Sequence, residues 1–395
     1  MYSLKDHLHQ PLNESIHLDH LEDIILDDGI AGAHVALNFI DSIRNGTKGV
    51  SITTKWDGSP AIVCGVNPEN DRFFIGTKSV FNKRSPKIIY SKDDIKKYYK
   101  DKPGLANQLE QVFDHLPKLD INGVLQGDLM FSKGEVQTKS IDGQEYETFK
   151  PNTIMYAVPS DSELAEKIRR AKLGIIFHTT YSGGTLKDMS PSYKVNLNDL
   201  KPSEDVWFDD ASYQDVSDSE SLTTDEQNII TKHLDDAEEV LASFNPIRLE
   251  HLLSSTQLIE MIKMYTNHEI RNGKQFHREY MDGLSKFIER RIDSEKMRDT
   301  VKDKKKAQYT GLLKRLEPTI TDILTFQSHI NSAKLLLINN LQKANTGTNT
   351  FSSSGDGIHT PTKQEGFVAV DHLTNKAVKL IDRLDFSKKN FERNG

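Results

Sequence analysis

The spacing of apolar residues changes twice along this chain of 395 residues. Between about residues 50 and 184, short runs rich in β-branched and aromatic residues predict strands. From residue 229 to residue 341, apolar positions recur every three to four residues, which predicts helices. A low-complexity stretch at residues 345–357 then precedes a last β-like run at residues 365–370. The pattern predicts an α+β fold in which an all-helical block interrupts a β-rich region.

Composition excludes several classes of protein. The formal net charge is −7, which argues against a protein that coats nucleic acid through bulk positive charge. Cys64 is the single cysteine, so we expect neither an internal disulfide nor a thiolate zinc cage. The chain lacks an apolar run of the length that a membrane span needs, and its first residues lack the apolar core of a secretory signal. We therefore expect a cytoplasmic protein without a membrane partner.

Charge is unevenly distributed in the second half of the chain. Residues 204–239 hold 13 acidic residues and one basic residue, whereas residues 286–315 hold 11 basic and five acidic ones. The basic run at residues 302–306 has the composition of a clamp for a nucleic-acid backbone. Such runs are somewhat more often a solvated helix face, or a partner for an acidic segment. The acidic stretch would repel a polynucleotide and is suited to a basic partner.

The string Lys55-Trp56-Asp57-Gly58 carries the most chemical information. It directly follows a strand-like run at residues 50–54. A lysine at a strand end, in a pocket with other cations, can lose its proton at neutral pH and attack a phosphorus atom. The alternative is a surface β-turn, because Asp-Gly is a common hairpin dipeptide and a lysine before it is usually solvated.

Together with three strings later in the chain, the Lys55-Trp56-Asp57-Gly58 string resembles the motifs of the covalent nucleotidyltransferase superfamily. That superfamily contains ATP-dependent DNA ligases, RNA ligases and mRNA capping enzymes. Lys55-Trp56-Asp57-Gly58 looks like motif I of that superfamily, and Gln126-Gly127-Asp128-Leu129 looks like motif III. Further along, Glu365-Gly366-Phe367-Val368 is similar to motif IV and Val378-Lys379-Leu380 to motif V. The likeness is closest to tailed-phage RNA-ligase-like proteins. It covers the β-rich parts of the chain and leaves the helical block unmatched.

The resemblance implies a covalent mechanism and a set of roles. Lys55 would attack the α-phosphate of ATP, releasing pyrophosphate and forming a lysyl-AMP intermediate, while Lys379 would contact the same phosphate. Glu365 and Asp128 would bind Mg²⁺ or Mn²⁺, or the ribose. Asp57 and Gly58 would help to form the nucleotide pocket.

Asp128 stands where the family usually has a glutamate, so its carboxylate reaches less far and a bridging water is expected. The alternative for Asp128 is a turn aspartate after a glycine. Tyr156 and Phe177 follow motif III, and either could be the aromatic ring on which the base stacks. Aromatic residues on β-runs are more often part of a core.

A second departure concerns motif V, where the family usually has two lysines one residue apart. Ile381 occupies the second position here, and Arg383 would supply the missing charge if it lay on the same strand face as Lys379. Lys78, with the basic residues 83–84, is another candidate for binding the leaving phosphates. The alternative for that cluster is a solvated loop.

These expectations combine into one organisation of the chain. Only 16 residues follow Lys379 (395 − 379), so we expect no C-terminal OB-fold domain of the kind that DNA ligases and capping enzymes carry. We expect a helical N-terminal segment at residues 1–45, a discontinuous nucleotidyltransferase core at residues 46–190 and 358–395, a helical insertion at residues 191–344, and a flexible linker at residues 345–357.

The expected function is that of an ATP-dependent RNA-ligase-like nucleotidyltransferase, acting on RNA or DNA ends in the host cytoplasm if a bacteriophage encodes it. One alternative is a non-catalytic phage accessory protein that uses the fold to bind a nucleotide or nucleic acid. Another is a nucleotidyltransferase whose acceptor is a protein or a small molecule. The helical insertion is the expected surface for a protein partner.

Overall fold

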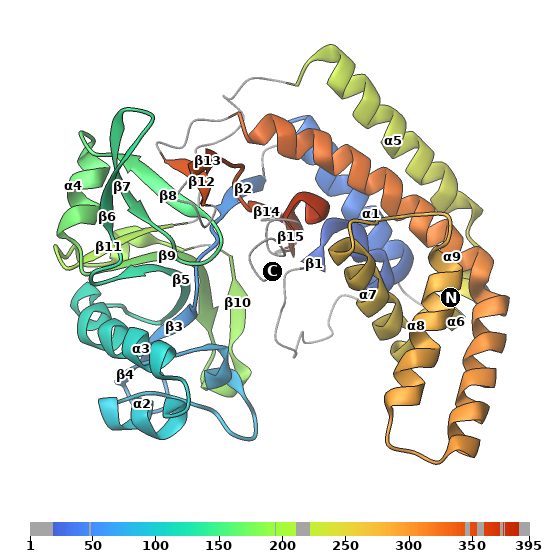
Figure 1. The fold of residues 1–395 in the computed structure, drawn as a ribbon, viewed down its shortest axis with the longest axis horizontal. Coiled ribbons are helices and arrows are strands. Elements are labelled where there is room, and N and C mark those ends of the chain that lie inside the picture. Colours follow the sequence, from blue (N-terminus) through green and yellow to red (C-terminus); the bar gives the residue numbers. More distant parts are fainter. Residues whose placement is uncertain are drawn as a thin grey trace.

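Two lobes flank a central sheet in this protein (Figure 1). The computed structural model describes residues 19–46, 49–193, 195–210, 222–343, 348–353, 359–371, 374 and 376–386. Within these residues the class is mixed, with long helices and mainly antiparallel sheets, so the expected α+β class is confirmed. In the same part of the chain, none of the helices combines the length and the apolar character that crossing a membrane requires.

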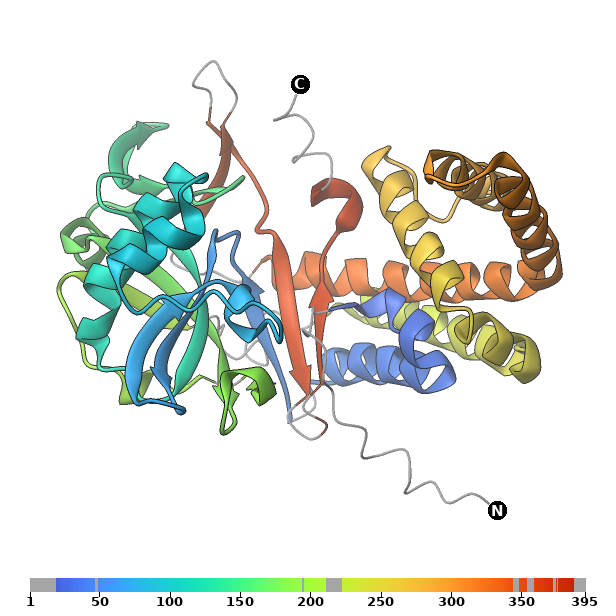
Figure 2. The ribbon, with the colours of Figure 1, turned by 90° about the horizontal axis from the view of Figure 1, so that it is seen from below.

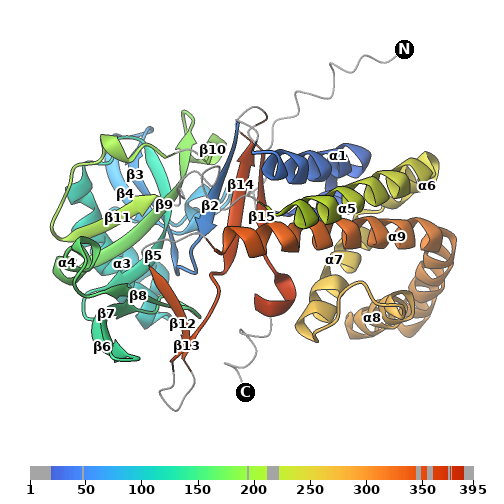
Figure 3. The same cartoon turned by 90° about the horizontal axis from the view of Figure 1, so that it is seen from above.

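The central sheet, which we call the bridging sheet, joins the two ends of the described chain. Its outer pair of strands is parallel and its other pairs are antiparallel. Figures 2 and 3 show two of its strands, from the C-terminal part of the chain, between the lobes. In spatial order the strands are β1 (Asp19–His20), β15 (Lys376–Leu380), β14 (Gly366–Asp371) and β2 (Val50–Lys55).

The β lobe contains two further sheets. A hairpin turn at residues 67–71 joins two strands that pair antiparallel. The first sheet has β10 (Ser190–Ser192), β9 (Leu173–Ser182), β5 (Val124–Ser132), β3 (Ala61–Asn67) and β4 (Arg72–Gly76) in order, with β11 (Val206–Asp210) parallel to β9. The second has β13 (His359–Pro361), β12 (Asn349–Ser353), β8 (Met155–Pro159), β7 (Gln144–Phe149) and β6 (Gln137–Ile141).

Strand β5 is the centre of the β lobe because both of its faces are covered. Leu129 packs in a core shared with the helices α2 (Lys92–Tyr99) and α3 (Pro103–His115). Met130, on the opposite face, packs in a core shared with the second sheet and α4 (Glu163–Arg170). Every residue of β5 is buried except Asp128, which is half-buried. A carboxylate in such a strand is a candidate functional group, since burying it there is costly.

The helical lobe contains the remaining long helices. One face of helix α5 (Thr224–Ser243) is buried, at the three-to-four spacing that the sequence predicts. Its buried residues are Ile230, Leu234, Ala237 and Leu241. The lobe comprises α1 (Ile25–Arg44), α5, α6 (Pro246–Leu253), α7 (Thr256–Arg271), α8 (Tyr280–Ser294) and the long α9 (Asp299–Leu341).

One face of the bridging sheet belongs to the core of the helical lobe. Phe367 and Ala369 of β14, with Val378 and Leu380 of β15, are buried in the same apolar cluster as the helices. Because side chains alternate along a strand, the residues between them occupy the opposite face. The bridging sheet therefore carries its apolar residues toward the helices and its polar ones away from them.

A buried ionic network reinforces this junction. Lys334 of α9 and Glu22, both fully buried, form an ion pair of 2.7 Å. Arg383, just after β15, contacts Glu22 and Asp23 and donates a hydrogen bond to Asn267 of α7. Removing one partner of such a pair costs about 3–5 kcal/mol, because the other charge stays buried without compensation.

The expected domain boundaries need three corrections. The β-rich part extends past residue 190, because β11 adds to the first sheet of the β lobe. The expected linker at residues 345–357 instead contributes β12, which pairs with β8; residues 354–358 lie outside the described part. The N-terminal helix α1 packs with α9, α5 and α6 as well as contacting β2, so it belongs to the helical lobe.

Candidate functional site

The site begins where the bridging sheet brings motif I and motif IV together. Gly366 of β14 pairs with Lys55 of β2 in an antiparallel register. The Nζ atom of Lys55 forms an ion pair with the carboxylate of Glu365, although 310 positions separate the two residues. The Lys55 side chain is 26% exposed and that of Glu365 only 8%. The lysine therefore stays accessible to solvent while its partner is held inside.

The Glu365 carboxyl lies in an environment that disfavours its charge. Its pKa is raised to about 7, mainly by burial and to a smaller extent by the carboxylates of Asp57 and Asp128, while Lys55 opposes the rise. The three carboxyl groups are therefore close enough to repel one another. A bound cation would relieve that repulsion.

Gly58 allows strand β5 to approach motif I. A Cβ atom at position 58 would lie 2.5 Å from the Cβ atom of Asp128 and 3.0 Å from the sulfur of Met130, so a side chain does not fit there. Backbone hydrogen bonds from Ser59 to Leu129 (2.9 Å) and from Leu129 back to Pro60 (3.1 Å) hold the two segments together. The glycine thus places the Asp128 carboxylate beside the loop that carries Lys55.

Asp57 has a structural position within the site. Its carboxylate accepts hydrogen bonds from the Asn152 side chain (2.8 Å) and from the backbone N–H groups of Thr153 (2.7 Å) and Ile154 (2.9 Å). Its own backbone N–H donates to the hydroxyl of Tyr156 at 2.7 Å. These bonds use most of the acceptor capacity of the carboxylate. Asp57 therefore fixes the loop after Lys55, and direct contact with a ligand is not its main role.

Lys379 lies on the same face of the bridging sheet as Lys55. Val368 pairs with Thr53 on one side and with Lys379 on the other. Directly paired residues share a face, and residues two apart along a strand do so too. Lys379 lies two strand spacings across the sheet from Thr53, and Lys55 is two residues further along, so the Cα atoms of the two lysines are roughly 12 Å apart. This face carries both predicted lysines, opposite the apolar face that packs on the helices.

His178 of β9 belongs to the site and was not predicted from sequence. Its Nε2 atom lies 3.7 Å from a carboxylate oxygen of Asp128, and its Nδ1 atom contacts the Thr179 hydroxyl at 2.7 Å. The pairing of β5 with β9 shifts register between Gln126 and Gly127. Asp128 pairs with Ile176 beyond this shift, and His178, two residues along β9 from Ile176, lies on the same face of the sheet. An isolated histidine within an apolar β-run was the only available signal.

The aromatic rings predicted to stack on a base are both buried. Phe177 is 0% exposed and packs in the core under α2 and α3, on the face of its sheet opposite Asp128. Tyr156 is close to the site but 2% exposed, with its ring centroid 4.9 Å from that of Trp56 and 5.6 Å from that of Phe149. A base cannot stack on either ring unless the core opens, so the stacking prediction is wrong for this arrangement.

The proposed substitute for the second motif V lysine also lies elsewhere. Strand β15 ends at Leu380, so the period-two argument does not extend to Arg383. The guanidinium of Arg383 is buried in the ionic network of the helical lobe. Lys78 is exposed in a short 3₁₀ helix, Lys78–Phe81, and among the described residues no contact joins it to Lys55.

Lysines of the basic run of α9 form ion pairs with nearby acidic residues. Lys305 forms an ion pair with Glu295 at 2.7 Å and Lys306 one with Asp293 at 2.6 Å, while Lys302 donates to the backbone oxygen of Asp293. These residues lie at the start of α9, at the end of the helical lobe away from the β lobe (Figure 1). The run therefore matches the alternative in which its lysines pair with an acidic segment.

The carboxylates of the site match the chemistry of a hard divalent cation. Mg²⁺ and Mn²⁺ prefer oxygen ligands, and Glu365 and Asp128 offer them next to each other. The electrostatic interaction of these carboxylates, which contributes to the raised pKa of Glu365, is the observation that supports the fit.

The chain belongs to a protein family described as a family of unknown function (DUF6267), whose model matches residues 13–394. No curated protein and no solved structure matches the chain.

Proposed function

We propose that this protein is an ATP-dependent nucleotidyltransferase that forms a covalent lysyl-AMP intermediate at Lys55. The observation that carries the proposal is the meeting of Lys55, Glu365 and Asp128 at one junction, from three segments distant in sequence. The resemblance of the four motifs to nucleotidyltransferases supports the same chemistry. A lysine that only stabilised the fold would not need a partly exposed amine beside the buried carboxyl of Glu365 and the half-buried one of Asp128.

The proposed step is an in-line displacement at the α-phosphorus of ATP. The Lys55 ammonium first gives up one proton, for which Glu365 is the adjacent acceptor, with its pKa of about 7. The neutral amine then forms the nitrogen–phosphorus bond as the bond to the bridging oxygen breaks and pyrophosphate leaves. Lys379, on the same sheet face, would stabilise the charge on the α-phosphate.

Incubation with α-labelled ATP and Mg²⁺ or Mn²⁺ tests this step. We expect a protein-bound label that is stable to alkali and labile to acid, as a phosphoramidate is. Lys55→Ala and Lys55→Arg should abolish it, whereas Lys314→Ala, an exposed lysine of α9, should leave it unchanged. Label that persists in Lys55→Ala would refute the assignment. The absence of label with every nucleoside triphosphate would favour the non-catalytic binding module.

The acceptor of the nucleotide is proposed to be the 5′-phosphate of an RNA or DNA strand. This rests on the likeness of the Glu365-Gly366-Phe367-Val368 string to phage RNA ligases, since the basic run of α9 does not support it. Labelled protein should discharge onto a 5′-phosphorylated strand and join it to a 3′-hydroxyl. If the label forms but is not transferred to any strand, the acceptor is a protein or a small molecule.

A further inference from the structure

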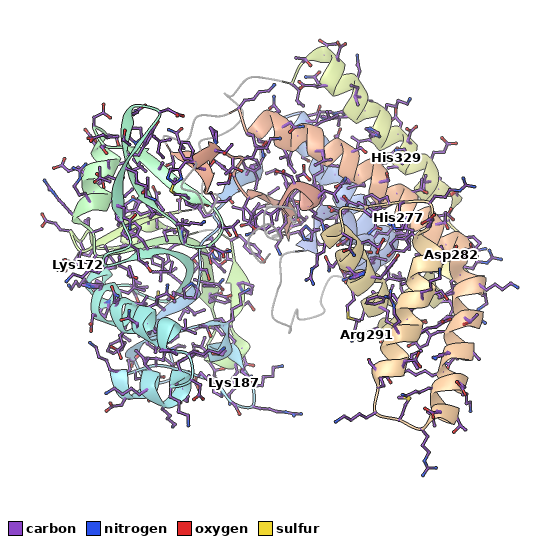
Figure 4. All side chains as sticks on the ribbon, viewed as in Figure 1. Lys172, Lys187, His277, Asp282, Arg291 and His329 are labelled. Atoms are coloured by element: carbon purple, nitrogen blue, oxygen red, sulfur yellow. The ribbon has the colours of Figure 1, made fainter. Side chains whose placement is uncertain are left out.

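Two helices of the helical lobe bring together a cluster of side chains that the proposed reaction does not use. His233 and Asp236 are three residues apart on α5 and so lie on the same side of that helix. His329 reaches them from α9, where Figure 4 shows it at the contact between the two helices, far from the β lobe. One ligand atom from each of the three residues lies within 4.8 Å of the others.

The distances within this cluster match those between ligands of one metal ion. The Nδ1 atoms of His233 and His329 are 3.2 Å apart, and Nδ1 of His329 is 3.7 Å from a carboxylate oxygen of Asp236. Ligands about 2.0–2.1 Å from a tetrahedral ion are separated by about 3.3–3.4 Å. The three groups therefore surround a position that one ion can occupy after small side-chain rotations.

The ligand types indicate which ion the cluster would select. Two imidazoles with one carboxylate suit Zn²⁺ and related transition-metal ions, whereas Mg²⁺ prefers oxygen ligands alone. The side chains of His329 and Asp236 are 25% and 37% exposed, so water can reach the position and complete the coordination. The nearby residues Leu234 and Ala237 are buried against α9, which holds both helices at this spacing without the ion.

We infer that His233, Asp236 and His329 form a Zn²⁺-class metal site that links α5 to α9. The ion would act as a structural link at the edge of the apolar seam, with water in the open position. This site is separate from the carboxylates around Lys55, because it lies in the other lobe. The inference does not depend on the proposed nucleotidyltransferase activity.

Titration of the chelator-treated full-length protein with Zn²⁺, and separately with Co²⁺, tests the inference. We expect one equivalent to bind with micromolar affinity, to raise the melting temperature by a few degrees, and to give Co²⁺ the visible absorption of a low-coordinate site. His233→Gln and His329→Gln should each weaken the affinity at least tenfold, while Mg²⁺ should not compete. His251→Gln, on the exposed face of α6, is the matched control and should bind as the wild type does.

Asp236→Asn keeps both imidazoles and provides a second test of the site if the histidine variants do not fold. It should reduce the affinity of a normally folded protein, as circular dichroism can verify. The inference is overturned if the wild type binds no Zn²⁺ at micromolar concentration, since the cluster would then be an ordinary hydrogen bond between histidines. It is also overturned if binding occurs but is unchanged in all three variants, since the ion would then lie elsewhere.

Discussion

Replacing Glu365 with glutamine should stabilise the protein while removing its proposed chemistry. The folded-state pKa of Glu365 is about 7, above its ordinary value of 4.5. Between these values the folded protein holds a proton that the unfolded chain has lost. The contribution of Glu365 to stability is therefore full below about pH 4.5 and falls as the pH rises through 7.

The size of the effect follows from the two pKa values. Linkage between pH 5 and pH 8 gives a loss of about 2.5 kcal/mol in the free energy of unfolding of the wild type, at 1.36 kcal/mol for each unit. Glu365→Gln carries no titrating group and should not show this loss. From pH 5 to pH 8, the free energy of unfolding of the variant should therefore rise by about 2.5 kcal/mol relative to that of the wild type.

Urea denaturation of both proteins at pH 5, 6, 7 and 8 measures the difference directly. Glu260→Gln, at an exposed position of α7, serves as the control and should follow the wild type at every pH. Parallel profiles for wild type and Glu365→Gln would refute the reasoning, because the carboxylate would then not be held against its charge. Labelling with α-labelled ATP should meanwhile fall by about two orders of magnitude in the glutamine variant.

Three other changes test neighbouring parts of the structure. Gly58→Ala should reduce lysyl-AMP formation more than tenfold in single-turnover labelling, because its Cβ would collide with Asp128. Asp57→Asn should lower the free energy of unfolding by about 2 kcal/mol in urea, since its amide would face the donor of Asn152. Neutralising the lysines of residues 304–306 should leave the salt dependence of binding to a 5′-phosphorylated strand unchanged in filter-binding assays; a flatter slope would show that the run does contact the strand.

The arrangement of the chain was predictable where it depends on local pattern. The helical period of α5 and the β-rich runs around β5 predicted the elements and the α+β class. The proximity of Lys55 and Glu365 was predictable only from the resemblance of the four motifs to those of nucleotidyltransferases. Neither hydropathy nor spacing could have placed together two residues that 310 positions separate.

Side-chain orientation was the main failure of the sequence predictions. In β9 the aromatic Phe177 faces the core and its neighbour His178 faces Asp128, so a one-residue error in parity exchanges a site residue for a buried one. The end of β15 at Leu380 similarly removed Arg383 from the predicted strand face. Strand β12 lies in a stretch of low complexity, and its pairing with β8 depends on backbone hydrogen bonds that composition does not report.

The pairing of β2 with β14 also bears on how the protein is made on the ribosome. At about 5–20 residues per second, the 310 positions between Lys55 and Glu365 take about 15–60 s to synthesise. During that interval Lys55 lacks its carboxylate partner, and the helices lack the apolar residues that Phe367 and Val378 bring to their core. Strands β14 and β15 thus complete both the site around Lys55 and the core of the helical lobe, and neither is complete before those strands have been synthesised. If the proposed function holds, Lys55 could not form lysyl-AMP before Glu365 and the strand that carries Gly366 are in place.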